Sequence, residues 1–283
     1  MADVCRWLQG VAPLELSETW DNTGLLLGDP AQAAERVMTC LTLTPASVAE
    51  AVAARAQMVV VHHPLPFKPL AKLTTQTVAG GMLWSLARAG ISVYAPHTAW
   101  DSAARGINAR LAELLGLADV QPLLPADPVA AAGVGSGRIG NLADPQPLST
   151  VIRQLSAALP GCRPRVVLPE LHSASHGDEG ASGGGAVPVR RVAIACGSGG
   201  SLLPAAAAAG SELFLTGEAT FHTCLEAQAA GVSLLMVGHF ASERFAMEQL
   251  ADEMGQALPG LQTWASQNEK DPVRNCSPQG IPW

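Results

Sequence analysis

Three short apolar segments of this sequence, each typical of a buried β-strand, are followed directly by histidine or carboxylate side chains. The segments cover residues 58–61, 91–95 and 232–237. The side chains that follow them are His62, His63, His97, Asp101, His239 and Glu243. Open α/β sheets bind ligands outside the carboxyl ends of their strands, so these segments place imidazoles and carboxylates where chemistry usually occurs. We therefore expect the three strand ends to converge on one site.

Five of these residues have the donor atoms and spacing of metal ligands: His62, His63, Asp101, His239 and Glu243. His239 and Glu243 are four residues apart, which puts both side chains on one face of a helix. Three imidazoles and two carboxylates exceed the needs of one tetrahedral ion but suit two ions that share bridging oxygens. Nitrogen and oxygen donors without thiolate predict Zn, Mn, Fe or Co, and either Asp101 or Glu243 could bridge the ions.

Two divalent metal ions per chain would supply hydrolytic chemistry. Ions about 3.5–4 Å apart polarise a substrate oxygen and lower the pKa of a shared water, so that a metal-bound hydroxide acts as the nucleophile. His97, which we expect in a loop before Asp101, could orient a ligand or carry a proton. Glu218 and His222 follow another strand and could serve as substrate-facing acid and base.

The composition is that of a globular protein without a nucleic-acid or membrane signature. Of 283 residues, 48% are apolar, which is ample for a core. The net charge of -7 at pH 7 provides no electrostatic footprint for nucleic acid, so we expect no such partner. The N-terminus lacks a signal-peptide pattern, no window approaches a membrane span, and the six cysteines form no C-x-x-C pair. These features predict reduced thiols and a cytoplasmic protein with no membrane partner.

Hydrophobic patterning predicts an α/β fold. A strand at 36–44, a helix at 45–56 and the strand at 58–61 match a parallel β-α-β unit, because the helical connection has about a dozen residues. A helix at 77–89 then leads into the strand at 91–95, which makes a second unit of the same kind. The metal site is thus expected at the C-terminal ends of parallel strands.

A change of composition near residue 117 suggests two layered α/β domains. We expect a metal-binding domain from residues 1–120 together with 232–283, and a second α/β domain inserted at 121–231. The inserted domain contains a Gly/Ser-rich segment near 172–187, which we interpret as a mobile hairpin tip. The Gly/Pro-rich tail from Pro259 predicts loosely packed surface.

Two glycine-containing loops allow more than one interpretation. The loop before Gly24 contains Trp20 and Asn22, and a plain turn into a core strand is favoured over a position beside the site. The segment Gly197-Ser198-Gly199-Gly200-Ser201 joins a strand to a helix and could offer amides to a phosphate or carboxylate. It lacks the lysine of a phosphate-binding loop, so a tight turn is at least as good an interpretation.

Five separated motifs carry a family resemblance that spans nearly the whole chain. They are His62-His63-Pro64, Trp20-Asp21-Asn22-Thr23-Gly24-Leu25, His97-Thr98 with Asp101, Thr216-Gly217-Glu218 with His222, and Gly238-His239 with Glu243. Together they resemble the Nif-three-like dinuclear metal-centre family, whose members often carry the name GTP cyclohydrolase 1 type 2. The resemblance implies two interlocked α/β domains and a ring-shaped homohexamer with metal sites facing an internal cavity. It also implies the same five metal ligands as the strand ends.

The sequence departs from the family pattern at two places near the site. Ala99-Trp100 stand where the family usually has Asn-Leu before the aspartate, and Glu218 stands where it usually has Asp. Both departures leave the five ligands intact and bear on the substrate pocket instead.

Two functions from different classes fit these observations. The first is a dinuclear metal-dependent hydrolase, similar to GTP cyclohydrolase 1 type 2, acting on a nucleotide or other phosphorylated small molecule. The second is a non-catalytic metal-binding or metal-carrier ring protein. Open coordination positions would favour the hydrolase, whereas ions enclosed entirely by protein would favour the carrier.

Overall fold

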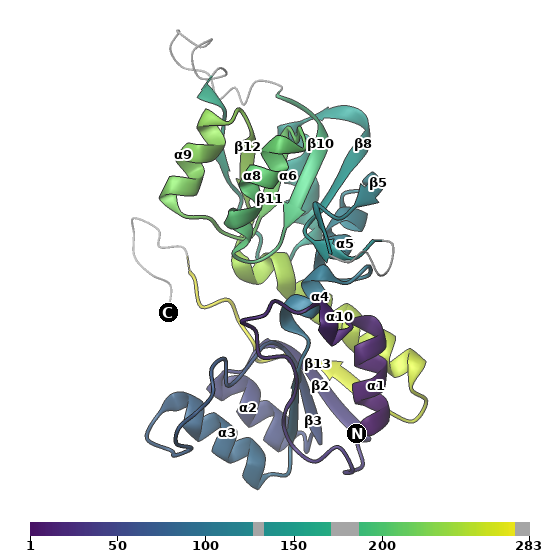
Figure 1. Ribbon diagram of the computed structural model, residues 1–283. Helices are drawn as coiled ribbons and strands as arrows, with labels where there is room; N and C mark the ends of the chain where they lie inside the picture. Colours follow the sequence, from purple (N-terminus) through teal and green to yellow (C-terminus); the bar gives the residue numbers. More distant parts are fainter. Residues whose placement is uncertain (127–132, 171–186, 275–283) are drawn as a thin grey trace.

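A computed structural model describes residues 1–126, 133–170 and 187–274 of the chain. The polypeptide forms two lobes, each built on its own β-sheet (Figure 1). The first sheet has the strand order β1-β4-β3-β2-β13, and only β1 runs antiparallel to its neighbour. Its strands are β1 Gly24–Leu27, β2 Arg36–Thr42, β3 Met58–His63, β4 Ser92–Ala95 and β13 Gln262–Ala265. The predicted β-α-β units are therefore present, and their parallel strands end on the same edge.

Helices around the first sheet agree with the two predicted ranges, as α2 Pro45–Ala53 and α3 Val78–Arg88, with one exception. The other helices there are α1 Ala2–Val11, α4 His97–Ser102 and α10 His239–Ala257, whereas α5 Ile107–Leu114 packs on strands of the second sheet. Thr44 caps α2, since its hydroxyl accepts a hydrogen bond from the Ser47 amide and Pro45 starts the first turn. The exception is α4, a short helix where a loop was expected. It carries His97 and Asp101 four residues apart, so both project from one face.

The second sheet has six strands in the order β5-β8-β10-β11-β12-β9. Its strands are β5 Ala118–Gln121, β8 Arg138–Pro147, β9 Arg165–Val167, β10 Pro188–Ala195, β11 Leu213–Thr216 and β12 Ser233–Met236. The remaining elements are the small strands β6 Leu124–Pro125 and β7 Gly135–Ser136, the 3-10 turns η1 Leu14–Leu16 and η2 Gly199–Leu202, and the helices α6 Leu148–Ala158, α8 Leu203–Ala208 and α9 Phe221–Ala229.

Sheet membership differs from the expected division of the chain at both boundaries. β12 pairs in parallel with β11, so the strand at 232–237 belongs to the second lobe although the metal-binding domain was expected to resume at residue 232. β5 also belongs to that sheet, although it precedes the expected boundary at residue 120. An apolar strand has the same pattern in either sheet, and only its hydrogen-bonded neighbour decides between them.

The tail is better ordered than its composition suggested. β13 adds to the edge of the first sheet beside β2, and Glu269 beyond it is buried. The Glu269 carboxylate accepts hydrogen bonds from the Leu41 and Thr42 amides at 2.9 and 2.6 Å, and Arg244 lies 2.8 Å away. These polar contacts add to the packing of Leu261 and Trp264 against the core. The prediction that the tail from Pro259 is loosely packed surface is therefore wrong as far as Glu269.

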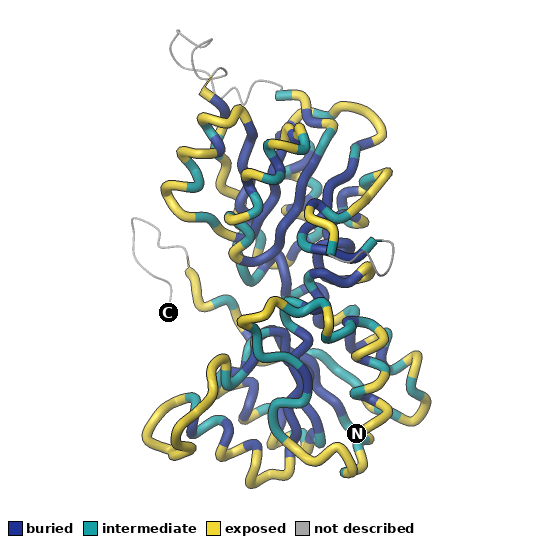
Figure 2. The backbone as a smooth tube through the Cα atoms, viewed as in Figure 1, coloured by how far each residue is buried: buried dark blue, intermediate teal, exposed yellow. Residues whose placement is uncertain are grey.

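One continuous core joins the two lobes. Val60 and Tyr94 of the first sheet belong to the same buried cluster as Ile194 and Leu235 of the second. Dark buried backbone runs through both lobes and the connection between them (Figure 2). α10 lies at this junction and packs on the first sheet through its buried face, which includes Met247. The interlocked α/β architecture that the resemblance implied is thus confirmed.

Two predictions concern parts of the chain outside this core. The Gly/Ser-rich tip near 172–187 lies outside the described residues, apart from Val187. None of the helices in the described part of the chain combines the length and apolarity needed to cross a bilayer.

Candidate metal centre

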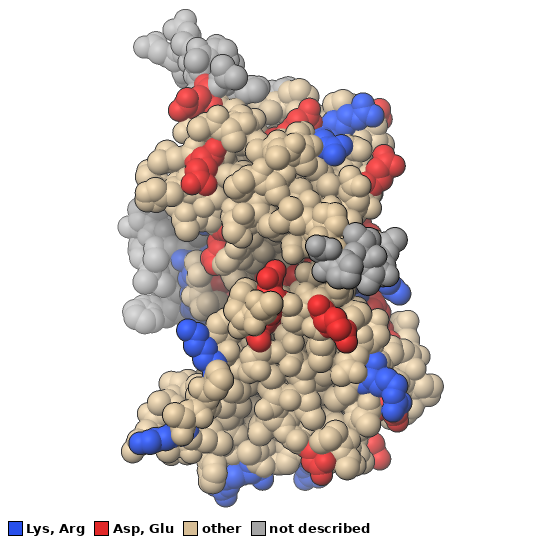
Figure 3. Space-filling view, in the orientation of Figure 1, with Lys and Arg blue, Asp and Glu red and all other residues tan. Residues whose placement is uncertain are grey.

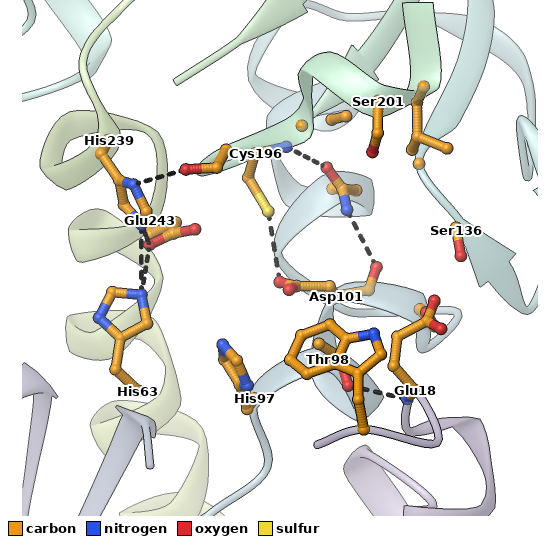
Figure 4. A pocket seen from close by; sticks show the side chains of 18 of the residues that line it. Glu18, His63, His97, Thr98, Asp101, Ser136, Cys196, Ser201, His239 and Glu243 are labelled. Atoms are coloured by element: carbon orange, nitrogen blue, oxygen red, sulfur yellow. Dashed lines mark hydrogen bonds and ion pairs between the residues drawn. The ribbon is translucent and has the colours of Figure 1, made fainter. Parts of the chain in front are cut away.

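Four side chains from three elements converge on Glu243, which is buried in α10. Its Oε2 lies 3.2 Å from His63 Nε2 and 3.1 Å from His239 Nε2. Its Oε1 lies 3.9 Å from His62 Nε2, which in turn is 3.6 Å from Asp101 Oδ1. Figure 4 shows His63, His239 and Glu243 on one side of a cavity and Asp101 facing them. All five residues predicted from the strand ends therefore come together.

The donor atoms of this cluster are better arranged to coordinate a divalent cation than to form hydrogen bonds with one another. The Nε2 atoms of His63 and His239 lie 3.3 Å apart, although at least one must be unprotonated for such an approach. Glu243 Oε2 has no hydrogen-bond partner despite its two short contacts, because the imidazoles are not aligned for donation. A buried carboxylate oxygen left without a donor is unfavourable unless a cation satisfies it. Among the described residues, two groups of side chains could hold a metal ion: His62, His63 and His97, and His63, His239 and Glu243.

The charges of the cluster are coupled through Glu243. Burial acts to raise the pKa of Glu243, but the contacts with His239 and His63 outweigh it and hold the pKa below its usual range. The same contact with Glu243 raises the pKa of His239 to about 9, against the opposing effect of burial. Burial first, and then repulsion from Glu243, raise the pKa of Asp101 to about 7, and burial lowers the pKa of His62. The donor set by itself thus holds protons that a metal ion would displace.

Hydrogen bonds from outside the cluster orient its imidazoles. The Thr42 hydroxyl lies 2.6 Å from His63 Nδ1, which leaves Nε2 directed at Glu243. Glu218 Oε1 lies 3.0 Å from His239 Nδ1 and accepts a hydrogen bond from Ser198 at 2.6 Å. Partners of this kind fix the tautomer and ring direction of metal-binding histidines. Glu218, predicted to face substrate, makes this contact with His239, and its substrate-facing role stays a prediction.

Asp101 has an orienting contact that sequence reasoning missed. The Cys196 thiol donates to Asp101 Oδ1 at 3.3 Å, and the Cys196 amide donates to Asn108 at 2.8 Å. Burial, followed by the Asp101 charge, raises the pKa of Cys196, so the thiol stays protonated and available as a donor. Cys196 is buried, and its thiol reaches the site.

His97 stands next to the cluster and is held by Asp21, another residue that the sequence did not single out. Asp21 Oδ1 lies 2.7 Å from His97 Nδ1, and Oδ2 accepts hydrogen bonds from the Thr98 amide and hydroxyl at 3.2 and 2.5 Å. Burial opposes ionisation of Asp21, but these hydrogen bonds outweigh it and lower its pKa to about 2. The turn containing Asp21 therefore lies beside the site, so the plain-turn interpretation is wrong.

Two other predicted features lie apart from the cluster or are engaged elsewhere. His222 is exposed on α9, in ring contact with Phe221, and does not line the cavity beside the metal ligands. Its role as a substrate-facing base stays a prediction. In the loop after β10, the Gly197 and Gly199 amides donate to Ser242 and Thr216 at 3.0 and 3.2 Å. These bonds support the tight-turn interpretation over the anion site.

The cluster opens into a cavity of about 580 Å³ between the lobes. His63, Asp101, His239 and Glu243 form part of its wall, and Ser136 and Ser201 lie across from them (Figure 4). A cavity of this size is in the range of small-molecule sites. The ligand set is therefore accessible from the cavity rather than sealed in the core.

Substitution of Gly197 tests how closely the backbone fits this cluster. A Cβ at Gly197 would lie 2.2 Å from Glu243 Oε1 and 3.3 Å from His239 Nε2, and the residue has φ +57. We expect Gly197→Ala to displace Glu243 and weaken metal binding at least tenfold, as outer contacts of metal sites typically do when lost. Metal titration measures this effect.

Gly210→Ala is the matched control for that substitution. Gly210 has φ +71 but no atom within 4 Å of the added Cβ, so it carries similar backbone strain without the clash. Equal metal affinity in the two variants would contradict the inferred position of Glu243 beside Gly197.

Comparisons with known proteins agree with this fold and identify the family. The sequence profile of the Duf34/NIF3 (NGG1p interacting factor 3) family matches residues 1–272. A protein of Clostridium perfringens named GTP cyclohydrolase 1 type 2 homolog is 28% identical over 273 residues, which cover 95% of this chain and 97% of that protein. Its namesake from Nostoc sp. is 34% identical over 223 residues, 77% of each chain. The crystal structure of a Bacillus cereus protein related to NIF3 matches with a TM-score of 0.83 at 20% identity, over 96% of this chain and 98% of that chain. The chain therefore belongs to the Duf34/NIF3 family, as its five motifs predicted.

Proposed function

We propose that this protein is a metal-dependent hydrolase of the GTP cyclohydrolase 1 type 2 kind, acting on a nucleotide or another phosphorylated small molecule. The observation that carries the proposal is the cluster of three imidazoles and two carboxylates, of which His63, Asp101, His239 and Glu243 line an open cavity. Structural metal sites are usually closed by protein, whereas catalytic ones keep positions open to substrate. The names of the relatives from Clostridium perfringens and Nostoc sp. point to the same reaction class.

The ligands proposed for two divalent ions, Zn, Mn, Fe or Co, are His62, His63, Asp101, His239 and Glu243. When bound, such ions act as Lewis acids and lower the pKa of water. Glu243 lies between His63 and His239 and is placed to bridge, whereas Asp101 contacts only His62 among the ligands described. This geometry supports Glu243 over Asp101 as the bridging carboxylate.

His97 is proposed to move a proton between substrate and solvent. Asp21 accepts from His97 Nδ1, which leaves Nε2 as the atom able to take up or release a proton in the cavity. His97 thus acts at the substrate, while Asp21 is a positioning residue that holds the ring through Nδ1. Opening of a purine imidazole ring requires such proton transfers, because water adds to carbon and a ring nitrogen leaves protonated.

Turnover of GTP by metal-loaded His97→Gln tests this function. Hydrolysis is measured both as ring opening and as phosphate release. We expect its rate to fall by about 10²–10⁴-fold, because a general acid–base is lost. Bound metal should stay at the native level. His222→Gln tests the other predicted base, because a comparable loss of turnover there would assign proton transfer to His222 as well. Asp21→Asn should lie between native and His97→Gln.

Absence of turnover in the native protein, with metal bound, would contradict the hydrolase and support the alternative of a metal-binding or metal-carrier protein. A second cavity of about 770 Å³ supports the metal-carrier alternative. Its lining includes His63, His239 and Glu218, so it gives another access to the proposed ligands. An ion could enter or leave through it without passing the first cavity.

Self-association into a homohexamer is part of the proposal. An apolar cavity of about 860 Å³ lies between α2 and α3 and is lined by Val48, Val52, Val78 and Met82. Val52 and Val78 are exposed in the single chain. Apolar surface of this kind supports an interface between subunits.

A further inference from the structure

Two aromatic side chains at the wall of the metal-site cavity are exposed to solvent. Trp20 is 59% exposed and Phe67 is 44% exposed, yet both line the cavity. Their ring centroids are 5.9 Å apart, and each ring is 6.2–6.3 Å from the imidazole of His97, which it meets edge-on. Large exposed aromatic faces that gather at one place usually mark a binding site.

The two aromatic residues are held in place by hydrogen bonds of their neighbours. Asn22 Nδ2 donates to the Pro66 carbonyl at 2.6 Å and so ties the Trp20 loop to the Phe67 loop. The same loop is joined to α4, since the Glu18 amide donates to the Thr98 hydroxyl at 3.0 Å. The aromatic faces are therefore preorganised, which reduces the entropy lost when a ligand binds.

Across from the metal ligands, the cavity wall offers hydroxyl groups and no basic side chain. Ser136 and Ser201 supply the hydroxyls, Glu18 is also part of the wall, and the described residues that line the cavity include no lysine or arginine. Arg163 and Arg165 line the second cavity instead. On the visible face of the molecule, basic side chains occur singly rather than in a patch (Figure 3). An anionic group thus has no cationic side chain to receive it beside Trp20.

We propose that Trp20 and Phe67 form a stacking site for a planar, uncharged heteroaromatic ring, which enters the cavity beside His97. The ring stacks on the exposed indole and phenyl faces, and its polar edge points toward the hydroxyls of Ser136 and Ser201. The stacking site rests on the proposed function in one respect, namely that the bound ring is the part of the substrate that is then hydrolysed. Binding of the ring itself requires no turnover.

Equilibrium dialysis with adenosine and guanosine tests this site, because these nucleosides carry the ring without a phosphate. We expect Trp20→Ala to weaken nucleoside binding by about 5- to 150-fold, which corresponds to the loss of one base-stacking contact. Phe67→Ala should act in the same direction, and Trp20→Phe should restore most of the affinity. Trp84→Ala is the control, since Trp84 is 45% exposed on α3 and lies outside the cavity.

Metal content and oligomer size, measured on the same samples, separate this proposal from the hydrolase. Normal nucleoside binding that depends on Trp20, in a protein without GTP turnover, would sustain the stacking site and contradict only the reaction. Native protein that binds ribose 5-phosphate but neither nucleoside would overturn the stacking site. Trp20→Ala protein that binds nucleosides as tightly as native protein would also overturn the stacking site. If the oligomer of this variant dissociates while nucleoside binding is unchanged, the aromatic pair is a subunit contact instead.

Discussion

Glu243→Gln is expected to lose its bound metal. The substitution keeps the size of the side chain but removes the charge that lies between His63 and His239, and it puts an amide donor near two imidazole nitrogens. Even outer-shell partners of metal sites contribute 10- to 100-fold to affinity, so we expect a loss on the order of 100-fold or more. Elemental analysis after dialysis, and the metal-dependent rise in Tm, measure it.

The pH dependence of metal binding provides a second measurement of the same cluster in the native protein. The pKa of His239 is raised to about 9, so its imidazole holds a proton at neutral pH when no metal is bound. A cation that binds His239 Nε2 must displace that proton, and the apparent affinity therefore rises with pH until pH passes about 9. Affinity that falls with increasing pH over this range would contradict His239 as a ligand.

Glu248→Gln is the matched control for Glu243→Gln. Glu248 lies on the same helix, is 57% exposed, and pairs with Arg244 at 2.8 Å rather than with the histidines. The control variant should retain native metal content, because exposed ion pairs contribute little to structure. If Glu243→Gln also retained native metal content, the ligand set proposed here would be wrong.

Arg138→Met is expected to cause the largest loss of stability. Arg138 is 2% exposed, and its guanidinium donates to the carbonyls of Gly135 and Gly137 at 2.7 and 2.6 Å. It also donates to the Ser102 and Ala103 carbonyls, which lie just beyond the Asp101 turn of α4. Burial lowers the pKa of Arg138, to about 10, so the side chain is still charged at neutral pH. One side chain thus fastens the second sheet to the helix that carries Asp101.

Methionine fills much of the same volume but removes the Arg138 donor from the buried carbonyls of Gly135, Gly137 and Ser102. The Ala103 carbonyl, in contrast, keeps its hydrogen bond from the Gly106 amide at 2.9 Å. Each unsatisfied carbonyl costs about 1–3 kcal/mol. Part of this cost is offset because the variant no longer buries a guanidinium charge, so we expect the free energy of unfolding to fall by about 3 kcal/mol. Urea denaturation measures it as a lower midpoint at unchanged slope. Arg153→Met is the control, because Arg153 is exposed on α6 with one hydrogen bond to Thr150 at 3.1 Å. Equal midpoints in the two variants would contradict the fastening role.

Local pattern was enough to predict which residues form the candidate site and most of the elements. The strand of Met58–His63 is apolar up to its last two residues, so the place where chemistry begins is visible in the sequence. The four-residue spacing of His239 and Glu243 likewise predicts a shared helix face, and both residues do lie on α10. Such features depend on neighbours in sequence, which is why they could be predicted.

The partners that orient those ligands could not be predicted in the same way. Asp21 and His97 are 76 positions apart, and Thr42 and His63 are 21 apart. A lone Asp in a turn or Thr at a strand end has many structural uses, so its type carries little information without the contact. Arg138 was unremarked for the same reason, since a basic residue in sequence is expected at the surface.

The sequence by itself determined which residue types end the strands, and with them the candidate ligands, the family and the α/β class. Only the tertiary structure decided that β12 belongs to the second sheet. The candidate ligands at the ends of β3, β4 and β12 therefore come from two sheets and meet between the lobes. The physical reason is that periodicity records whether a strand is buried, whereas its position follows from pairing and from one core shared by both lobes.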